Sequence, residues 1–124
     1  MKKILIAEDS SVIQNLTKKI LQFQNFEVFS AKNGQEVLTN LEGSNYDAIL
    51  MDINMPVMDG MECTREIRKL DSEKSKTPVI AITGNARNYS DEEFKEAGVD
   101  AFLQKPLNFD LLVETVKKFT SSQE

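Results

Sequence analysis

Short apolar runs alternate five times with segments in which apolar residues recur at helical spacing. This alternation constrains the fold more than any other feature of the chain. Runs that are apolar throughout, separated by helices, indicate strands of a parallel sheet that is covered by helices on both faces. The sequence therefore predicts a five-stranded, doubly wound α/β fold. The 124 residues suit one domain over 1–124, and the polar stretch 71–77 is too short to divide it.

The expected elements follow one another in strict alternation. Strands are expected at Lys3–Ala7, Phe26–Ala31, Tyr46–Met51, Pro78–Ile82 and Asp100–Leu103. Helices are expected at Ser11–Phe23, after a cap at Asn33, at Gly60–Leu70, from Ser90 to Ala97, and after a cap at Asn108. In the first helix, Ile13, Leu16 and Ile20 recur on one face.

Charged and polar side chains come where these strands end. Glu8 and Asp9 follow the first strand and Asp52 the third, whereas Thr83 follows the fourth and Lys105 the fifth. The carboxyl ends of parallel strands lie at one edge of the sheet, and sites form there near the point where the strand order reverses. We therefore expect these five side chains to line one crevice.

The charges in this crevice favour a metal. Three carboxylates and the Lys105 ammonium sum to a charge of −2, which a divalent cation would neutralise. All-oxygen ligands suit Mg²⁺, with Mn²⁺ as a possible substitute. Asp52 beside such a metal and a lysine could attack a phosphoryl group, because carboxylates serve as nucleophiles that form aspartyl phosphates. The metal and Lys105 would stabilise the charge that develops on the phosphoryl oxygens.

Each of these residues alone also has an ordinary structural explanation. Asp52 could be a turn or cap residue, and Glu8 with Asp9 could favour the dipole of the first helix. Thr83 is a common strand residue, and an isolated Lys105 would suit any surface. Their placement at successive strand ends is what favours a functional site.

Composition excludes several classes of function. The chain has no histidine, which rules out Ser-His-Asp triads, histidine-based zinc sites and histidine phosphorylation within it. Its net charge of −5 argues against direct nucleic-acid binding. No apolar run approaches the roughly 18 to 20 residues of a membrane span, and the start of the chain lacks a signal-peptide core. With a single cysteine, Cys63, a cytoplasmic location is expected.

Four stretches, in order, carry a family resemblance: ILIAEDS, ILMDINMPVMDG, IAITG and FLQKPL. As a set they resemble the receiver domain of two-component response regulators, and the resemblance runs from Lys2 to about Phe119. It implies a flavodoxin-like sheet with strand order 2-1-3-4-5. Because only 120–124 follow the last helix, it further implies a stand-alone receiver without an output domain.

The resemblance also implies a role for each residue at the acidic end of the crevice. Asp52 matches the phosphoacceptor, and Glu8 and Asp9 match the acidic pair that holds Mg²⁺ together with it. Asn54 matches the position whose backbone carbonyl ligates the metal, and its side chain lies at a position that tunes dephosphorylation. The pair is Glu-Asp where many members have Asp-Asp, which lengthens one arm but should preserve the metal site.

The remaining matches concern switching. Thr83 matches the hydroxyl that turns toward the bound phosphoryl group. Lys105 matches the lysine that pairs with that group, and its bond to Pro106 is expected to be cis. Phe102 falls at the aromatic switch position, which is often a tyrosine in relatives. Asn85 is a second position that tunes dephosphorylation.

The function implied is that of a phosphoryl-accepting signalling module, not a turnover enzyme, although it assists its own phosphorylation and dephosphorylation. A sensor histidine kinase or histidine phosphotransfer protein would supply the phosphoryl group. The face formed by the fourth helix, fifth strand and last helix would then control a downstream protein, or the group would be relayed. Neither nucleic acid nor membrane is expected as a direct partner.

Two alternatives belong to other classes. An aspartate-nucleophile phosphatase usually needs a second acid two residues after the nucleophile, and Asn54 stands there. A flavin- or ligand-binding flavodoxin-like module would need a hydroxyl- and glycine-rich loop after the first strand. The sequence AEDSS places acids in that loop instead.

Overall fold

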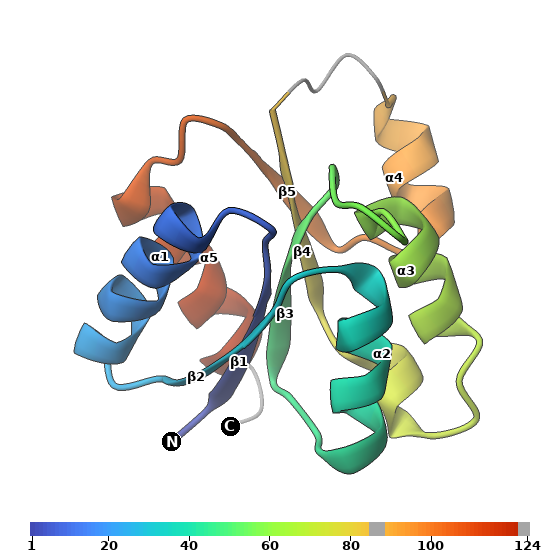
Figure 1. The fold of residues 1–124 in the computed structure, drawn as a ribbon, viewed down its shortest axis with the longest axis horizontal. Helices are drawn as coiled ribbons and strands as arrows, with labels where there is room; N and C mark the ends of the chain where they lie inside the picture. The colour runs from blue at the N-terminus through green and yellow to red at the C-terminus, as the bar shows by residue number, and fades with distance from the viewer. Residues whose placement is uncertain (85–88, 122–124) are drawn as a thin grey trace.

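A parallel five-stranded sheet forms the centre of the molecule (Figure 1). The computed structural model describes residues 1–84 and 89–121. The strands lie in the order β2-β1-β3-β4-β5, which confirms the predicted flavodoxin-like topology. Their bounds are β1 Lys3–Ala7, β2 Glu27–Ala31, β3 Ala48–Asp52, β4 Val79–Thr83 and β5 Ala101–Gln104.

Helices cover both faces of the sheet (Figure 1). They are α1 Ser11–Phe23, α2 Gly34–Gly43, α3 Gly60–Arg68, α4 Asp91–Ala97 and α5 Phe109–Ser121. Helices α1 and α5 lie on one face and α2, α3 and α4 on the other. A short 3₁₀ helix, η1 Glu73–Lys76, occupies the segment that the sequence predicted to be a polar connection.

The burial of the strands explains their apolar sequences. Strands β3 and β4 are buried at every position, and β1 at all but its first, because helices pack on both sides of them. The edge strands β2 and β5 contain buried, partly buried and exposed residues. Separate core clusters fill the two sides, with Leu112 of α5 in one and Val37 of α2 in the other.

Local capping fixes where the helices begin. The side chains of Asn33, Ser90 and Asn108 accept backbone N–H bonds from residues three further along, as predicted. Ser90 and Glu93 form a complete capping box. Glu36, at the corresponding position of α2, accepts from the N–H of Lys32, which is one residue before the cap, and not from the N–H of Asn33 as a capping box would require.

The buried face of α1 is not centred on the apolar stripe of Ile13, Leu16 and Ile20. The buried residues are Gln14, Thr17 and Leu21, whereas Leu16 is 47% exposed. The helix is rotated by about one position from the apolar stripe, because Leu21 enters the core and the Gln14 carboxamide finds backbone partners beneath the helix. The strand predictions were early by one or two residues for β3, β4 and β5, so Asp52 and Thr83 are the last residues of their strands.

Both ends of the described chain lie at the edge of the sheet opposite the carboxyl ends of the strands. The start of β1 and the end of α5 both lie near the amino-terminal edge (Figure 1). The carboxyl ends of the strands point toward the opposite edge. The strand order reverses between β1 and β3, which is the place where sites form in such sheets.

Candidate functional site

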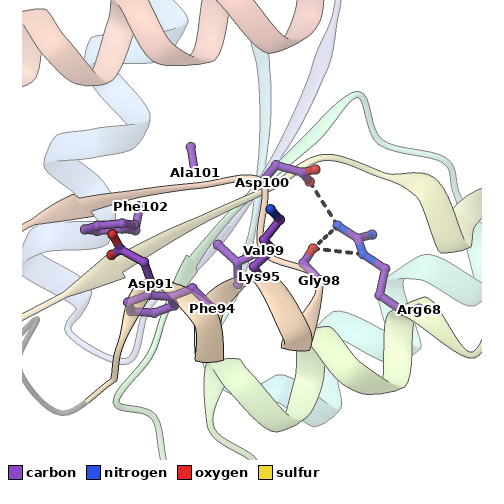
Figure 2. Close-up of a pocket in the computed structure, with 9 residues that line it drawn as sticks. All are labelled: Arg68, Asp91, Phe94, Lys95, Gly98, Val99, Asp100, Ala101 and Phe102. Carbon is purple, nitrogen blue, oxygen red and sulfur yellow. Dashed lines mark hydrogen bonds and ion pairs between the residues drawn. The ribbon is translucent and has the colours of Figure 1, made fainter.

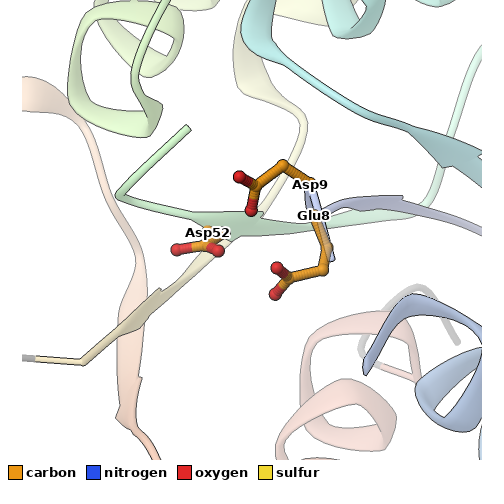
Figure 3. A group of neighbouring side chains, drawn as sticks. All are labelled: Glu8, Asp9 and Asp52. Atoms are coloured by element: carbon orange, nitrogen blue, oxygen red, sulfur yellow. The ribbon is translucent and has the colours of Figure 1, made fainter. Parts of the chain in front are cut away.

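Three carboxylates meet at the carboxyl ends of β1 and β3 (Figure 3). Glu8, Asp9 and Asp52 each offer an oxygen, and these oxygens all lie within 4.8 Å of one another. Glu8 and Asp52 are buried, and Asp9 is exposed. Figure 3 shows Glu8 and Asp9 leaving the end of β1 on different sides, with Asp52 facing both. The predicted convergence of the acids is therefore present.

Backbone and side-chain bonds hold the Asp52 carboxylate in place. Its Oδ1 accepts the Asn54 N–H at 3.0 Å, and its Oδ2 accepts from Lys105 Nζ at 3.1 Å. The Gly60 N–H donates to the carbonyl of Ile53 at 3.0 Å. A Cβ on Gly60 would lie only 2.4 Å from the Asp52 carbonyl oxygen, so the tight loop after β3 requires a glycine there.

Lys105 supplies the cation of the site from the end of β5. Its Nζ lies 3.1 Å from Asp52 Oδ2 and 3.7 Å from Glu8 Oε1, and its side chain is 28% exposed. Burial acts to lower the pKa of Lys105, but the hydrogen bond and charge of Asp52, with the charges of Glu8 and Asp9, raise it overall. Lys105 therefore stays protonated at neutral pH. The peptide bond from Lys105 to Pro106 is cis, as predicted.

Glu8 is the acid whose ionisation is most strongly affected. Burial is the main cause that raises the pKa of Glu8 from 4.5 to about 7, and the neighbouring Asp52 adds to the effect. The Ser10 N–H, which donates to Glu8 Oε2 at 3.1 Å, and the charge of Lys105 act in the opposite direction. A bound cation would reduce the unfavourable energy of holding these neighbouring carboxylates in their charged forms.

Thr83 and Gly84 close the site on the β4 side. Thr83 is buried at the end of β4, and its carbonyl accepts the Lys105 N–H at 2.9 Å. Among the described residues, a Cβ on Gly84 would meet only Lys105 Cδ, at 3.9 Å, which is an ordinary van der Waals contact. Asn85, which directly follows Gly84, lies outside the described residues.

Phe102 lies away from the acids, on β5. It is 38% exposed and stacks on Phe94 of α4, with ring centroids 4.9 Å apart and planes inclined by 15°. Both rings border a surface hollow of about 650 Å³ (Figure 2). Arg68 lies at the far side of this hollow and donates to the Gly98 carbonyl and to the Asp100 carboxylate.

The donor set fits a hard divalent cation. Three carboxylates at the carboxyl ends of β1 and β3, one of them exposed, provide the oxygen ligands that Mg²⁺ prefers. Asn54 follows directly in the turn after β3. When ionised, the three carboxylates and the Lys105 ammonium carry a net charge of −2, which one divalent cation would neutralise.

The sequence did not reveal two residues that join separate segments of the chain, Gln14 at the carboxyl-terminal edge of the sheet and Arg68 at the opposite edge. Gln14 of α1 donates to the carbonyls of Glu8 and Ala31. Arg68 of α3 joins the carbonyls of Ser75, Thr77 and Gly98. Both bind backbone oxygens of segments distant in the sequence, and no local pattern signals such contacts.

Fold and site together define an α/β domain with an acidic, oxygen-rich site at the switch point of its sheet. The model of the response regulator receiver domain family matches residues 4–117. The chain therefore belongs to this family, whose members act in two-component signalling.

Relatives range from long proteins to single domains. The chain is 39% identical to hybrid signal transduction histidine kinase I of Dictyostelium discoideum, over 92% of the chain but only 7% of the kinase. It is 30% identical to the polar-differentiation response regulator DivK of Brucella anthropi, with 95% of each covered. The crystal structure of response regulator TrrA from Thermotoga maritima, in complex with Mg²⁺-BeF, superposes with a TM-score of 0.85 at 38% identity, covering 96% of this chain and 99% of that one.

Among the helices of the described residues, none combines the length and apolar character needed to cross a membrane.

Proposed function

We propose that Asp52 accepts a phosphoryl group, in a Mg²⁺-dependent reaction, from a phosphohistidine on a sensor kinase or phosphotransfer protein. The observation that carries this proposal is the position of the buried Asp52 carboxylate, which lies between two further acids and the Lys105 ammonium at 3.1 Å. The complex of TrrA with Mg²⁺-BeF adds support, because beryllofluoride mimics a phosphoryl group on a carboxylate.

The residues of the site divide the chemistry among them. Glu8, Asp9 and Asp52, with the Asn54 carbonyl, would hold the metal, which when bound neutralises the acids and polarises the phosphoryl oxygens. An Asp52 oxygen attacks phosphorus as the bond from phosphorus to the donor imidazole nitrogen breaks, and that nitrogen keeps the electron pair. Lys105, released from its bond to Asp52, pairs with a phosphoryl oxygen.

Switching would begin at Thr83. Its hydroxyl is the one best placed to donate to a phosphoryl oxygen on Asp52, because β3 and β4 are paired and both residues end their strands. Movement of Thr83 toward the phosphoryl group would free volume near α4 for Phe102, which now stacks outside on Phe94. The face formed by α4, β5 and α5 would change shape as a shift between two populated packings.

This reading makes the domain a signalling module. It would assist the formation and loss of its own phosphoryl group, would not turn over a substrate, and would act in the cytoplasm. Its partners would be the kinase or phosphotransfer protein and a downstream protein that reads the α4-β5-α5 face, without direct contact to nucleic acid or membrane. Residues 1–124 would form this module as one domain.

Phosphorylation with acetyl phosphate and Mg²⁺ tests the acceptor. Intact-mass measurement should show one phosphorylated species that is stable in acid and labile in base, and Asp52→Asn should abolish it. Asp110→Asn, at an exposed aspartate on α5, is the matched control and should be labelled like the wild type. Undiminished labelling of Asp52→Asn would show that the acceptor is another residue.

Amide NMR with beryllofluoride and Mg²⁺ tests the switch. Shifts should spread from Asp52 through Thr83 and Gly84 to Phe102 and α4. Changes confined to the immediate neighbours of Asp52 would show that the domain binds phosphate without switching.

A further inference from the structure

The Glu8-Asp9 peptide is held by a buried side chain from the neighbouring helix. Gln14 of α1 is only 7% exposed, and its Nε2 donates to the Glu8 carbonyl at 3.1 Å and to the Ala31 carbonyl at 3.0 Å. The Ala31 carbonyl also accepts the Glu8 N–H, at 3.0 Å. These three bonds form a closed arrangement at the carboxyl ends of β1 and β2.

The geometry requires a primary amide at this place. An amide nitrogen carries two hydrogens, and Gln14 directs one at each of two carbonyl oxygens. A carboxylate there would place negative oxygens against both carbonyls, and an apolar side chain would leave two buried acceptors without this donor. Paired strands end at Ala7 and Ala31, so Gln14 supplies the bond to the Glu8 carbonyl just where the sheet ladder stops.

The bonded carbonyl has a special position. It belongs to the peptide unit that joins Glu8 to Asp9, and the orientation of that unit decides how both side chains leave the strand. The Glu8 N–H and C=O are thus both fixed, one by Ala31 and the other by Gln14. Figure 3 shows the two carboxylates facing Asp52 from different sides, an arrangement that a rotated peptide would lose.

We propose that Gln14 is a positioning residue for divalent-cation binding, which acts by fixing the peptide between Glu8 and Asp9. It touches neither the cation nor the phosphoryl group. The inference rests on the proposed function, because the cation is the one that Glu8, Asp9 and Asp52 would hold. Partners that orient metal ligands typically change affinity by about 10- to 100-fold when removed.

The test is an NMR titration with MgCl₂, which reports folding and Mg²⁺ affinity in the same spectra. Gln14→Met keeps the length and helix propensity of the side chain but removes the amide, and it should weaken Mg²⁺ binding about tenfold. The amides of Asp9 and Ser10 should already shift before Mg²⁺ is added. Gln22→Met makes the same change at an exposed position of α1 and should bind like the wild type.

A second control separates positioning from loss of stability. Thr120→Val removes a buried hydroxyl that donates to the Val116 carbonyl at the far end of α5. It should lower the melting temperature and leave Mg²⁺ affinity unchanged. If Gln14→Met does not fold, Gln14→Asn replaces it, since this amide is too short to reach both carbonyls and should also weaken binding.

The outcomes distinguish this inference from the proposed function. The positioning role alone is overturned if the wild type binds Mg²⁺ and a folded Gln14 variant binds it with an affinity within twofold of the wild type. A wild-type domain that does not bind Mg²⁺ overturns the proposed function and the positioning role together. A tenfold loss in Gln14→Met, with both controls unaffected, supports the inference.

Discussion

Lys105 should act as a resident counter-cation that stabilises the metal-free domain and competes with Mg²⁺. Lys105→Met removes the ammonium but keeps an unbranched side chain of similar length. The Asp52 carboxylate, 2% exposed, then loses the donor at 3.1 Å, and Glu8 loses its partner at 3.7 Å. Breaking a fully buried pair costs about 3–5 kcal/mol. Because Lys105 is 28% exposed and water can reach the gap, we expect a loss of about 2 kcal/mol.

Thermal unfolding without Mg²⁺ should show this loss as a fall of about 8 °C in Tm, since 1 kcal/mol corresponds to roughly 4 °C in a domain of this size. With Mg²⁺ the difference should shrink. Removing the positive charge takes the ionised site from −2 to −3, and we expect Mg²⁺ to bind about tenfold more tightly, which is about 1.4 kcal/mol. Phosphorylation should nevertheless be impaired.

Lys117→Met, an exposed lysine on α5, is the matched control and should alter neither Tm nor Mg²⁺ affinity. The reasoning is refuted if Lys105→Met is as stable as the wild type without Mg²⁺, or if its Mg²⁺ affinity falls.

Three further predictions concern stability. Because the pKa of Glu8 is raised to about 7, this group stabilises the metal-free fold fully below pH 4.5, and the contribution is lost as pH rises through 7. Glu8→Gln should therefore gain more stability over the wild type at pH 8 than at pH 6 in thermal unfolding. An equal gain at both pH values would contradict this prediction. Arg68→Ala should lose about 2–3 kcal/mol in urea unfolding, because several carbonyls lose a charged donor, whereas exposed Arg65→Ala should be near neutral. Val57, 81% exposed with φ of 71°, is strained, so Val57→Asn should gain about 1 kcal/mol by the same measurement, while no gain would argue against strain there.

The parts of the structure that follow local rules could be predicted. Caps such as Asn33 and Ser90 bond to residues three positions away, so the sequence alone contains both partners. The convergence of Glu8, Asp9 and Asp52 could also be predicted, because the topology of a parallel sheet places strand ends together. That inference required only the order of elements and no side-chain detail.

The remainder depends on contacts that no local pattern encodes. Gln14 is buried where periodicity favoured apolar neighbours, since backbone carbonyls satisfy its amide. The last residues of β3 and β4 stay in the sheet because pairing of Asp52 with Ile82, and of Thr83 with Gln104, continues the ladder past the apolar runs. The partners of Arg68 come from η1 and from the turn between α4 and β5, a juxtaposition visible only in the folded chain.

The position of the two chain ends has a consequence for how such a domain can be combined with others. The start of β1 and the end of α5 lie at the edge of the sheet opposite the acids (Figure 1). A fusion partner joined at either end would extend away from Asp52 and leave the incoming donor an open approach. With this geometry, the domain can be joined to other domains through either end without covering the acidic site. The stretch that aligns with this chain makes up 7% of hybrid signal transduction histidine kinase I and 95% of DivK, so similar units occur both within a long protein and as most of a short one.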